Sequence, residues 1–116
     1  MKLYLAGPMT GYPAYNFPAF HAAAAALRAR GHDVWSPAER DEQEGFNPQT
    51  DTAHPLRYYM RWDLPAVLES DAVATLPGWE ESVGANLEVH VAQVCAIPIY
   101  TIDALLDGDA QRRAAP

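Results

Sequence analysis

Four short apolar segments, separated by stretches with helical spacing, are the feature that most restricts the fold of this chain. They cover Leu3 to Ala6, His32 to Trp35, Ala72 to Leu76 and Ile97 to Ile102. Strands that read as near-continuous apolar runs are typical of parallel sheets that are buried on both faces. The sequence therefore predicts an α/β domain with three layers, in which helices cover both faces of a flavodoxin-like or Rossmann-like parallel sheet of four to five strands.

The segments between these strands predict three helices. They cover Phe17 to Arg30, Leu56 to Glu69 and roughly Ala85 to Cys95, and Asp103 to Leu106 is expected to start a short last helix. Asn16 is the expected N-cap of the first helix, and Pro65 is expected to kink the second or to start a new segment there. The polar and acidic stretch from Ala38 to His54 has no clear periodicity, so we expect a long surface loop that borders a ligand pocket.

The length of 116 residues fits one domain. We expect this domain to cover residues 1–106, followed by a frayed C-terminal tail over residues 107–116. Right-handed crossovers favour the strand order 2-1-3-4, which places the first and third strands side by side. Ligands bind where the loops of such neighbouring strands diverge. Gly7 to Gly11 and Pro77 to Gly84 should therefore form the two lips of one crevice.

Charge and composition exclude several classes of function. A formal net charge of -7 argues against binding to polymeric nucleic acid, which requires clustered Lys and Arg. The single cysteine, Cys95, excludes an intrachain disulfide, and the chain has no signal peptide pattern and no apolar run long enough for a membrane span. We therefore expect a cytoplasmic protein. No metal-ligand spacing, phosphate loop or dinucleotide-binding motif is present, so we expect no metal and no cofactor.

Glu88 and Asp63 are the candidate catalytic residues. Glu88 lies about one turn into the third predicted helix, near an end whose dipole favours negative charge, so it should be ionised. The alternative is a surface glutamate that only stabilises the helix end. Asp63 lies in the second helix, and its alternative is an N-cap just ahead of Pro65. The sequence alone does not place these two side chains together.

Three motifs carry a family resemblance over most of the chain: Tyr4-Leu5-Ala6-Gly7-Pro8-Met9-Thr10-Gly11, Arg61-Trp62-Asp63-Leu64, and Ser82-Val83-Gly84-Ala85-Asn86-Leu87-Glu88. With these motifs the sequence resembles the nucleoside 2-deoxyribosyltransferase-like superfamily. This superfamily includes the deoxynucleoside monophosphate N-hydrolases and a phage- and prophage-associated group of unknown function.

The resemblance implies that Glu88 is the nucleophile at the anomeric carbon and that Asp63 lies near the leaving base. The implied substrate-binding residues are Tyr4, Gly7, Pro8, Met9, Thr10, Ser82 and Gly84. Relatives are homodimers or larger, which implies a homo-oligomer here, and Tyr58, Tyr59 and Trp62 are candidates for its interface. Ser82 stands where the nucleoside transferases carry Asp, which favours a nucleotide because a hydroxyl can hydrogen-bond a 5′-phosphate.

Three hypotheses about function follow from these residues. The first is an enzyme that cleaves or exchanges the N-glycosidic bond of a (deoxy)nucleoside or nucleoside 5′-monophosphate through Glu88. The second is a non-catalytic module that binds a nucleotide in the same crevice. The third is an oligomerising protein whose catalytic site has drifted.

Overall fold

The computed structural model describes the backbone of residues 1–114 and the side chains of residues 1–108. Four parallel strands form one sheet in the order β2-β1-β3-β4. They are β1 (Lys2–Ala6), β2 (Asp33–Trp35), β3 (Ala72–Thr75) and β4 (Ile99–Thr101). The predicted α/β class and the strand order 2-1-3-4 are confirmed.

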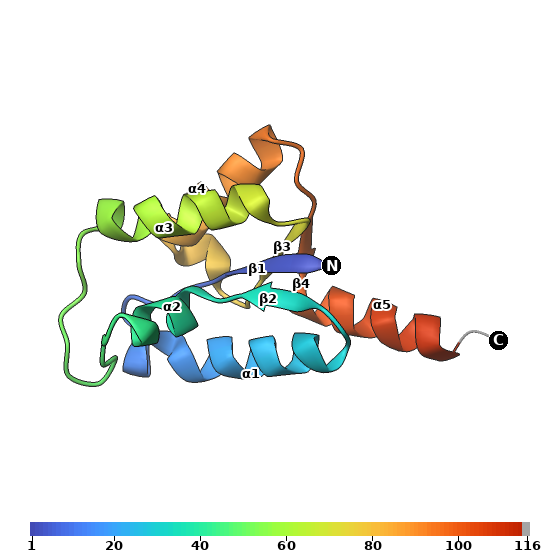
Figure 1. Cartoon of the computed structure of the whole chain (residues 1–116), viewed down its shortest axis with the longest axis horizontal. Coiled ribbons are helices and arrows are strands. Elements are labelled where there is room, and N and C mark those ends of the chain that lie inside the picture. The colour runs from blue at the N-terminus through green and yellow to red at the C-terminus, as the bar shows by residue number, and fades with distance from the viewer. Residues whose placement is uncertain (115–116) are drawn as a thin grey trace.

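Helices cover both faces of this sheet (Figure 1). One layer contains α1 (Phe17–Ala29), with α2 (Pro37–Gln43) and α5 (Ile102–Ala114); the other contains α3 (Leu56–Glu69) and α4 (Val83–Val94). Two short helical turns, η1 (Pro13–Asn16) and η2 (Trp79–Glu81), lie in the loops after β1 and β3. None of the described helices combines the length and the apolar character needed to cross a membrane.

Strand β1 separates two apolar clusters by the alternation of its side chains. Leu3 and Leu5 are fully buried in the cluster that contains α1 and α5. Tyr4 and Ala6 are fully buried in the opposite cluster, against α3 and α4. Because successive residues of a strand point to opposite faces, this register places the Tyr4 side chain on the α4 side of the sheet.

The segment expected to be a long loop from Ala38 to His54 begins instead with helix α2, so that expectation was wrong for its first part. Pro37 occupies the first turn of α2, where its missing N–H has no cost. Helix α3 continues through Pro65 without a second start. Pro65 is exposed, and so is Arg61 one turn before it, so the carbonyl that loses its partner can face water.

The expected cap of α1 also differs from the prediction, whereas the last helix, α5, begins at Ile102, next to its expected start at Asp103. Asn16 has a left-handed backbone conformation, and its Nδ2 donates to the Pro8 carbonyl at 3.0 Å rather than capping the helix. Helix α5 continues to Ala114, well beyond residue 106. The last two residues of the expected tail, 115–116, lie outside the described residues.

Candidate active site

The loops after β1 and β3 approach each other closely at the carboxyl ends of the two strands. A Cβ atom on Gly7 would lie 2.8 Å from the Leu76 Cβ, so only glycine fits this approach. A pocket opens beside this point, and its wall is formed by helices α1, α2, α3 and α4 together with the loops after β1 and α2. Its lining comprises Gly7, Met9, Thr10, Tyr15, Phe17, Phe20, Pro37, Asp41, Phe46, Ala53, Leu56, Tyr59, Met60, Asp63, Ser82, Gly84, Ala85 and Glu88.

Two of the predicted site residues are not part of this lining. Tyr4 is fully buried beneath the pocket. Pro8 lies in the loop after β1, where its carbonyl holds Asn16. The other predicted residues, Gly7, Met9, Thr10, Asp63, Ser82, Gly84 and Glu88, all line the pocket.

Asp63 and Glu88 meet in this pocket because α3 and α4 pack side by side. Each residue is only 5% exposed. Burial raises the pKa of both carboxyl groups, and repulsion from Asp63 raises the pKa of Glu88 further. Burial and this repulsion therefore oppose the ionised form of Glu88 that the helix dipole was expected to favour. Asp63 lies inside α3, so the alternative of an N-cap ahead of Pro65 was wrong.

Tyr4 holds the Glu88 carboxyl group in position through a hydrogen bond from its buried hydroxyl. Its hydroxyl donates to Glu88 Oε2 at 2.5 Å, and this hydrogen bond favours the ionised form of Glu88. The Tyr4 ring stacks on Trp35 with 5.3 Å between centroids and 17° between planes. Burial and the charge of Glu88 raise the pKa of Tyr4 well above its usual range, so the hydroxyl keeps its proton.

Ser82 and Gly84 form the start of α4 at the pocket rim. The Ser82 hydroxyl accepts from the Ala85 N–H at 3.2 Å and so caps the helix. A side chain at Gly84 would meet Leu56 Cδ1 at 3.3 Å, so glycine lets α3 approach α4 here. The two residues therefore shape the rim and also serve the packing of the helix.

Sequence reasoning missed several residues that line the pocket, above all Asp41. Asp41 lies on α2 and is 5% exposed, and burial raises its pKa to about 6. The start of α2 has a sequence signal, because Ser36 and Glu39 have the spacing of a capping box. In the structure Ser36 makes no capping bond and Glu39 binds Arg28 instead. The spacing of Ser36 and Glu39 predicts where the helix starts, but it does not predict that the Asp41 side chain faces the pocket.

The pocket also contains aromatic side chains that the sequence placed in loops. Tyr15 lies in η1, and its ring meets Phe46 edge-on with 5.5 Å between centroids. Phe46 in turn lies 6.0 Å from the Phe17 ring. Together with Tyr59 these rings give the pocket flat apolar walls, which suit a planar heterocycle.

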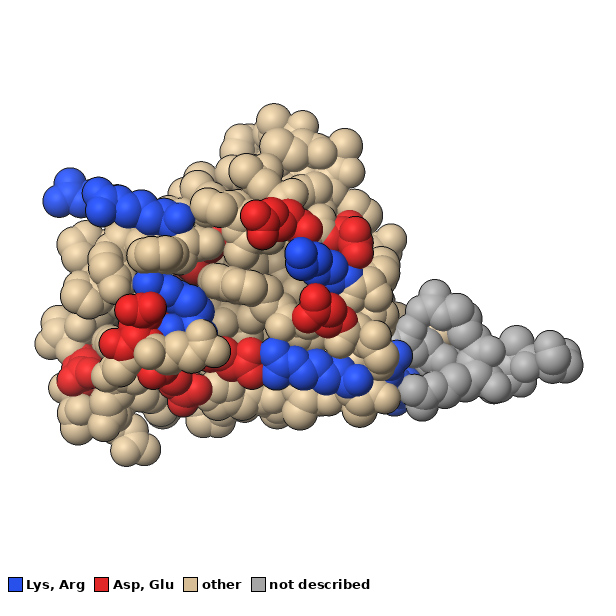
Figure 2. Space-filling view, viewed as in Figure 1, with Lys and Arg blue, Asp and Glu red and all other residues tan. Residues whose placement is uncertain are grey.

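The charges of the pocket are of one sign. Its lining contains the three acidic residues Asp41, Asp63 and Glu88, and none of its described side chains is Lys or Arg. By contrast, Figure 2 shows acidic and basic side chains interspersed over an outer face of the molecule. In the described part of the chain, no group of three or more His, Cys, Asp or Glu side chains is arranged to hold a metal ion.

Comparison with known proteins relates this architecture to one family and one fold. The sequence pattern of a family described as a domain of unknown function (DUF4406) matches residues 1–101. The fold is similar to that of a 2-deoxyribosyltransferase from the psychrotolerant bacterium Bacillus psychrosaccharolyticus, a biocatalyst for nucleoside synthesis. The TM-score is 0.61 with 20% sequence identity, and the match covers 87% of this chain and 71% of that chain. No curated protein matches the sequence. The predicted resemblance is thus confirmed at the level of the fold.

Proposed function

Because this chain belongs to the DUF4406 family and has the fold of a 2-deoxyribosyltransferase, we propose that it cleaves or exchanges the N-glycosidic bond of a nucleoside. The observation that carries this proposal is the buried pair of carboxyl groups, Asp63 and Glu88, in a pocket with aromatic walls. Two carboxyl groups at a glycosidic bond can act as nucleophile and acid.

In the proposed reaction one proton is shared by the two carboxyl groups. Its transfer to Asp63 leaves Glu88 ionised, and the Tyr4 hydroxyl stabilises that anion. A Glu88 oxygen then forms a bond to the anomeric carbon while the carbon–nitrogen bond breaks. The electron pair of that bond leaves with the base, which takes the proton from Asp63.

The second half of the reaction regenerates the carboxylate. Water attacks the anomeric carbon, gives its proton to Asp63 and releases Glu88, which amounts to hydrolysis. If a second base attacks instead, the same step is a transfer. Both acceptors use the same two side chains.

We further propose that the substrate is a nucleoside rather than its 5′-monophosphate. Asp63 and Glu88 face the pocket with no Lys or Arg in its described lining, and Asp41 has only a long contact of 3.4 Å with Arg40, so a phosphate would be repelled. Ser82, the residue that favoured a nucleotide, already accepts a hydrogen bond from Ala85. If the substrate were a monophosphate, Lys or Arg side chains from outside this lining would have to neutralise the phosphate.

The test is a panel of nucleosides and their 5′-monophosphates, with release of free base followed by chromatography. We expect release from nucleosides, and we expect Glu88→Gln to reduce the rate by at least about a thousandfold, because the nucleophile is lost. Glu80→Gln is the matched control, since Glu80 is exposed and outside the pocket lining. Release that survives Glu88→Gln would remove Glu88 from its role, and tight binding without release would favour a binding module.

A further inference from the structure

Asp41 is an acidic side chain of the pocket that the proposed reaction does not use. It faces the same pocket as Asp63 and Glu88 but comes from α2, which packs on α1. Among the described side chains, its one hydrogen-bond partner is Arg40, whose Nη1 lies 3.4 Å from Asp41 Oδ1. One long bond leaves most of the acceptor capacity of a carboxylate for a ligand.

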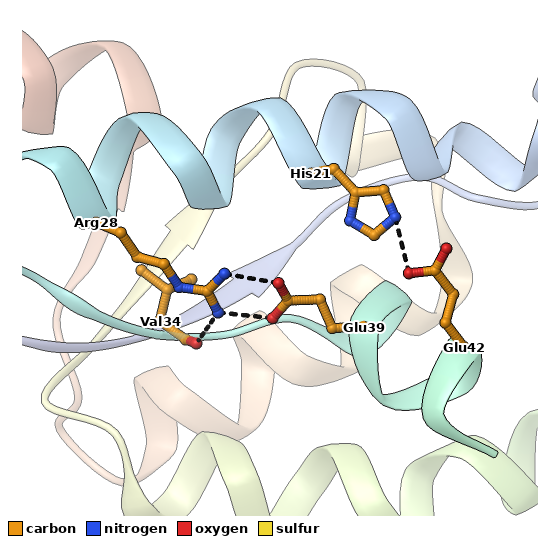
Figure 3. Close-up of polar contacts among 5 residues, drawn as sticks. All are labelled: His21, Arg28, Val34, Glu39 and Glu42. Atoms are coloured by element: carbon orange, nitrogen blue, oxygen red, sulfur yellow. Dashed lines mark hydrogen bonds and ion pairs between the residues drawn. The ribbon is translucent and has the colours of Figure 1, made fainter.

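Helix α2 is held firmly enough to keep this carboxyl group in place. Arg28 of α1 donates to both oxygens of Glu39 at 2.6 Å and also binds the Val34 carbonyl at 2.8 Å (Figure 3). One turn along α2, Glu42 pairs with His21 at 3.0 Å. These contacts lie on the α1 side of α2, and they hold the helix that carries Asp41.

Arg40 is itself fixed by aromatic rings, on the side away from α1. Its guanidinium lies 4.3 Å from the centre of the Trp62 ring and 5.5 Å from that of Tyr58. A cation stacked in this way is not free to swing into the pocket. Asp41 is therefore the polar group that α2 presents to a ligand.

Asp41 belongs to the end of the pocket that suits a base. Phe46 and Tyr59 line the pocket beside it, and Phe46 follows directly from α2, with its N–H on the Asp41 carbonyl at 3.0 Å. The charge of Asp41 is close enough to raise the pKa of Asp63, the acid proposed to protonate the leaving base. A base between these aromatic rings would present one edge to Asp63 and another to Asp41.

We propose that Asp41 is a specificity-determining residue that selects nucleosides whose base presents two neighbouring N–H donors, such as an amino group beside a ring N–H. This inference rests on the proposed function. An ionised carboxylate only accepts hydrogen bonds, and its two oxygens match two parallel N–H groups. With a pKa of about 6, the group is mostly ionised at pH 8. A base edge that offers only acceptors would be disfavoured, because its lone pairs would face the lone pairs of the Asp41 carboxylate.

Deoxyguanosine and deoxyinosine provide a matched pair of substrates, because they differ only in the amino group beside the ring N–H. At pH 8 we expect the wild-type protein to favour deoxyguanosine in kcat/KM by about tenfold or more, as expected for one charge-assisted hydrogen bond. Asp41→Asn should reduce this ratio to near one, because the amide places a donor against a donor. Glu44→Gln is the control: the same change of charge at the end of α2, on an exposed residue outside the pocket lining.

Binding of both nucleosides to the Glu88→Gln variant, measured by calorimetry with and without Asp41→Asn, separates this inference from the proposed function. Base release with a ratio that Asp41→Asn does not change overturns the assignment of Asp41 and leaves the reaction intact. An Asp41-dependent preference in binding, without any base release by the wild type, retains the assignment and overturns the reaction. Absence of both binding and base release overturns both. If Asp41→Asn melts below the assay temperature, Asp41→Ser provides the same test.

Discussion

Asp63 and Glu88 repel each other when both are ionised, and burial adds to the cost of each charge. The pair therefore holds one proton over a range of pH in which isolated carboxyl groups would hold none. This single proton serves both proposed roles, since one group must be ionised to attack and the other must be protonated to release the base. The two titrations belong to the pair rather than to either residue.

The shared proton predicts a bell-shaped pH profile for base release. On acidification the pair takes up a second proton and Glu88 loses its nucleophilic form, while at alkaline pH the pair loses its proton and the base leaves unassisted. Asp63→Asn should lower the rate and flatten the alkaline limb, because the acid is removed. The measurement is kcat/KM over pH 4 to 10 for both proteins. An alkaline limb unchanged in Asp63→Asn would contradict the role of Asp63.

The sequence predicted some of these residues better than others. Glu88 follows the small-residue turn Ser82 to Gly84 at the start of a predicted helix, and the predicted strand order 2-1-3-4 placed this turn at the crevice. Asp63 and Asp41 reach the pocket because α3 packs on α4 and α2 packs on α1, and sequence spacing does not encode which side of a helix faces a ligand. Tyr4 was predicted at the site, but its contact with Glu88 required the register of β1.

At the level of elements, the turn η1 stores conformational strain beside the pocket. Ala14, Tyr15 and Asn16 have φ values of 51°, 50° and 62°, which is a left-handed turn without a glycine. Each such residue costs about 1–2 kcal/mol. The turn carries Tyr15 into the pocket wall, and it is secured by the Asn16 bond to Pro8 and the Tyr15 hydroxyl bond to the Asp51 carbonyl.

Relief of this strain can be tested by making the same Ala→Gly substitution in η1 and in α1. Ala14→Gly should raise the free energy of unfolding by about 0.5–1 kcal/mol, because glycine adopts a positive φ without steric cost. Ala25→Gly, at an exposed position of α1, should instead lower it by about 1 kcal/mol. Urea denaturation measures both values. Equal destabilisation by the two changes would show that η1 is not strained.

The sequence predicted the strands and three of the helices because their apolar spacing is regular. Leu56–Glu69 was predicted with the bounds that the structure shows. Helix α2 was missed because seven residues with two adjacent buried apolar side chains, Pro37 and Ala38, give no periodic signal. Its stability comes from contacts with α1, and such tertiary contacts are not visible in a local pattern.

At the scale of the whole molecule, α3 and α4 leave an apolar stripe on the outer side of the molecule. It consists of Leu64 and Leu68 of α3 with Val83, Leu87, Val91 and Val94 of α4, all exposed or half-buried. Val83 is 75% and Val94 is 70% exposed. The sequence favoured Tyr58, Tyr59 and Trp62 as an interface, yet Tyr58 and Tyr59 are half-buried against His54 within the chain.

We propose that this α3–α4 stripe is the interface of a homodimer, since apolar area of this kind is unfavourable in water. Val94→Glu should raise the dissociation constant of the dimer by at least about tenfold, because it places a charge in an apolar contact. Gln93→Glu, at the exposed neighbouring position, is the control. Sedimentation velocity over a range of protein concentrations gives the result. A wild-type monomer at every concentration would contradict the proposal.

The alternation of side chains along β1 makes the hydrogen bond between Tyr4 and Glu88 depend on strand alignment. If β1 paired with its neighbours one residue out of register, Leu3 or Leu5 would point toward Asp63 and Glu88. The Tyr4 ring would then be buried among the residues of α1. Such a chain would have nearly the same secondary structure and no hydroxyl donor for Glu88, the proposed nucleophile. During refolding, the recovery of turnover would therefore report correct pairing of the central strand, which circular dichroism does not distinguish from a misaligned sheet.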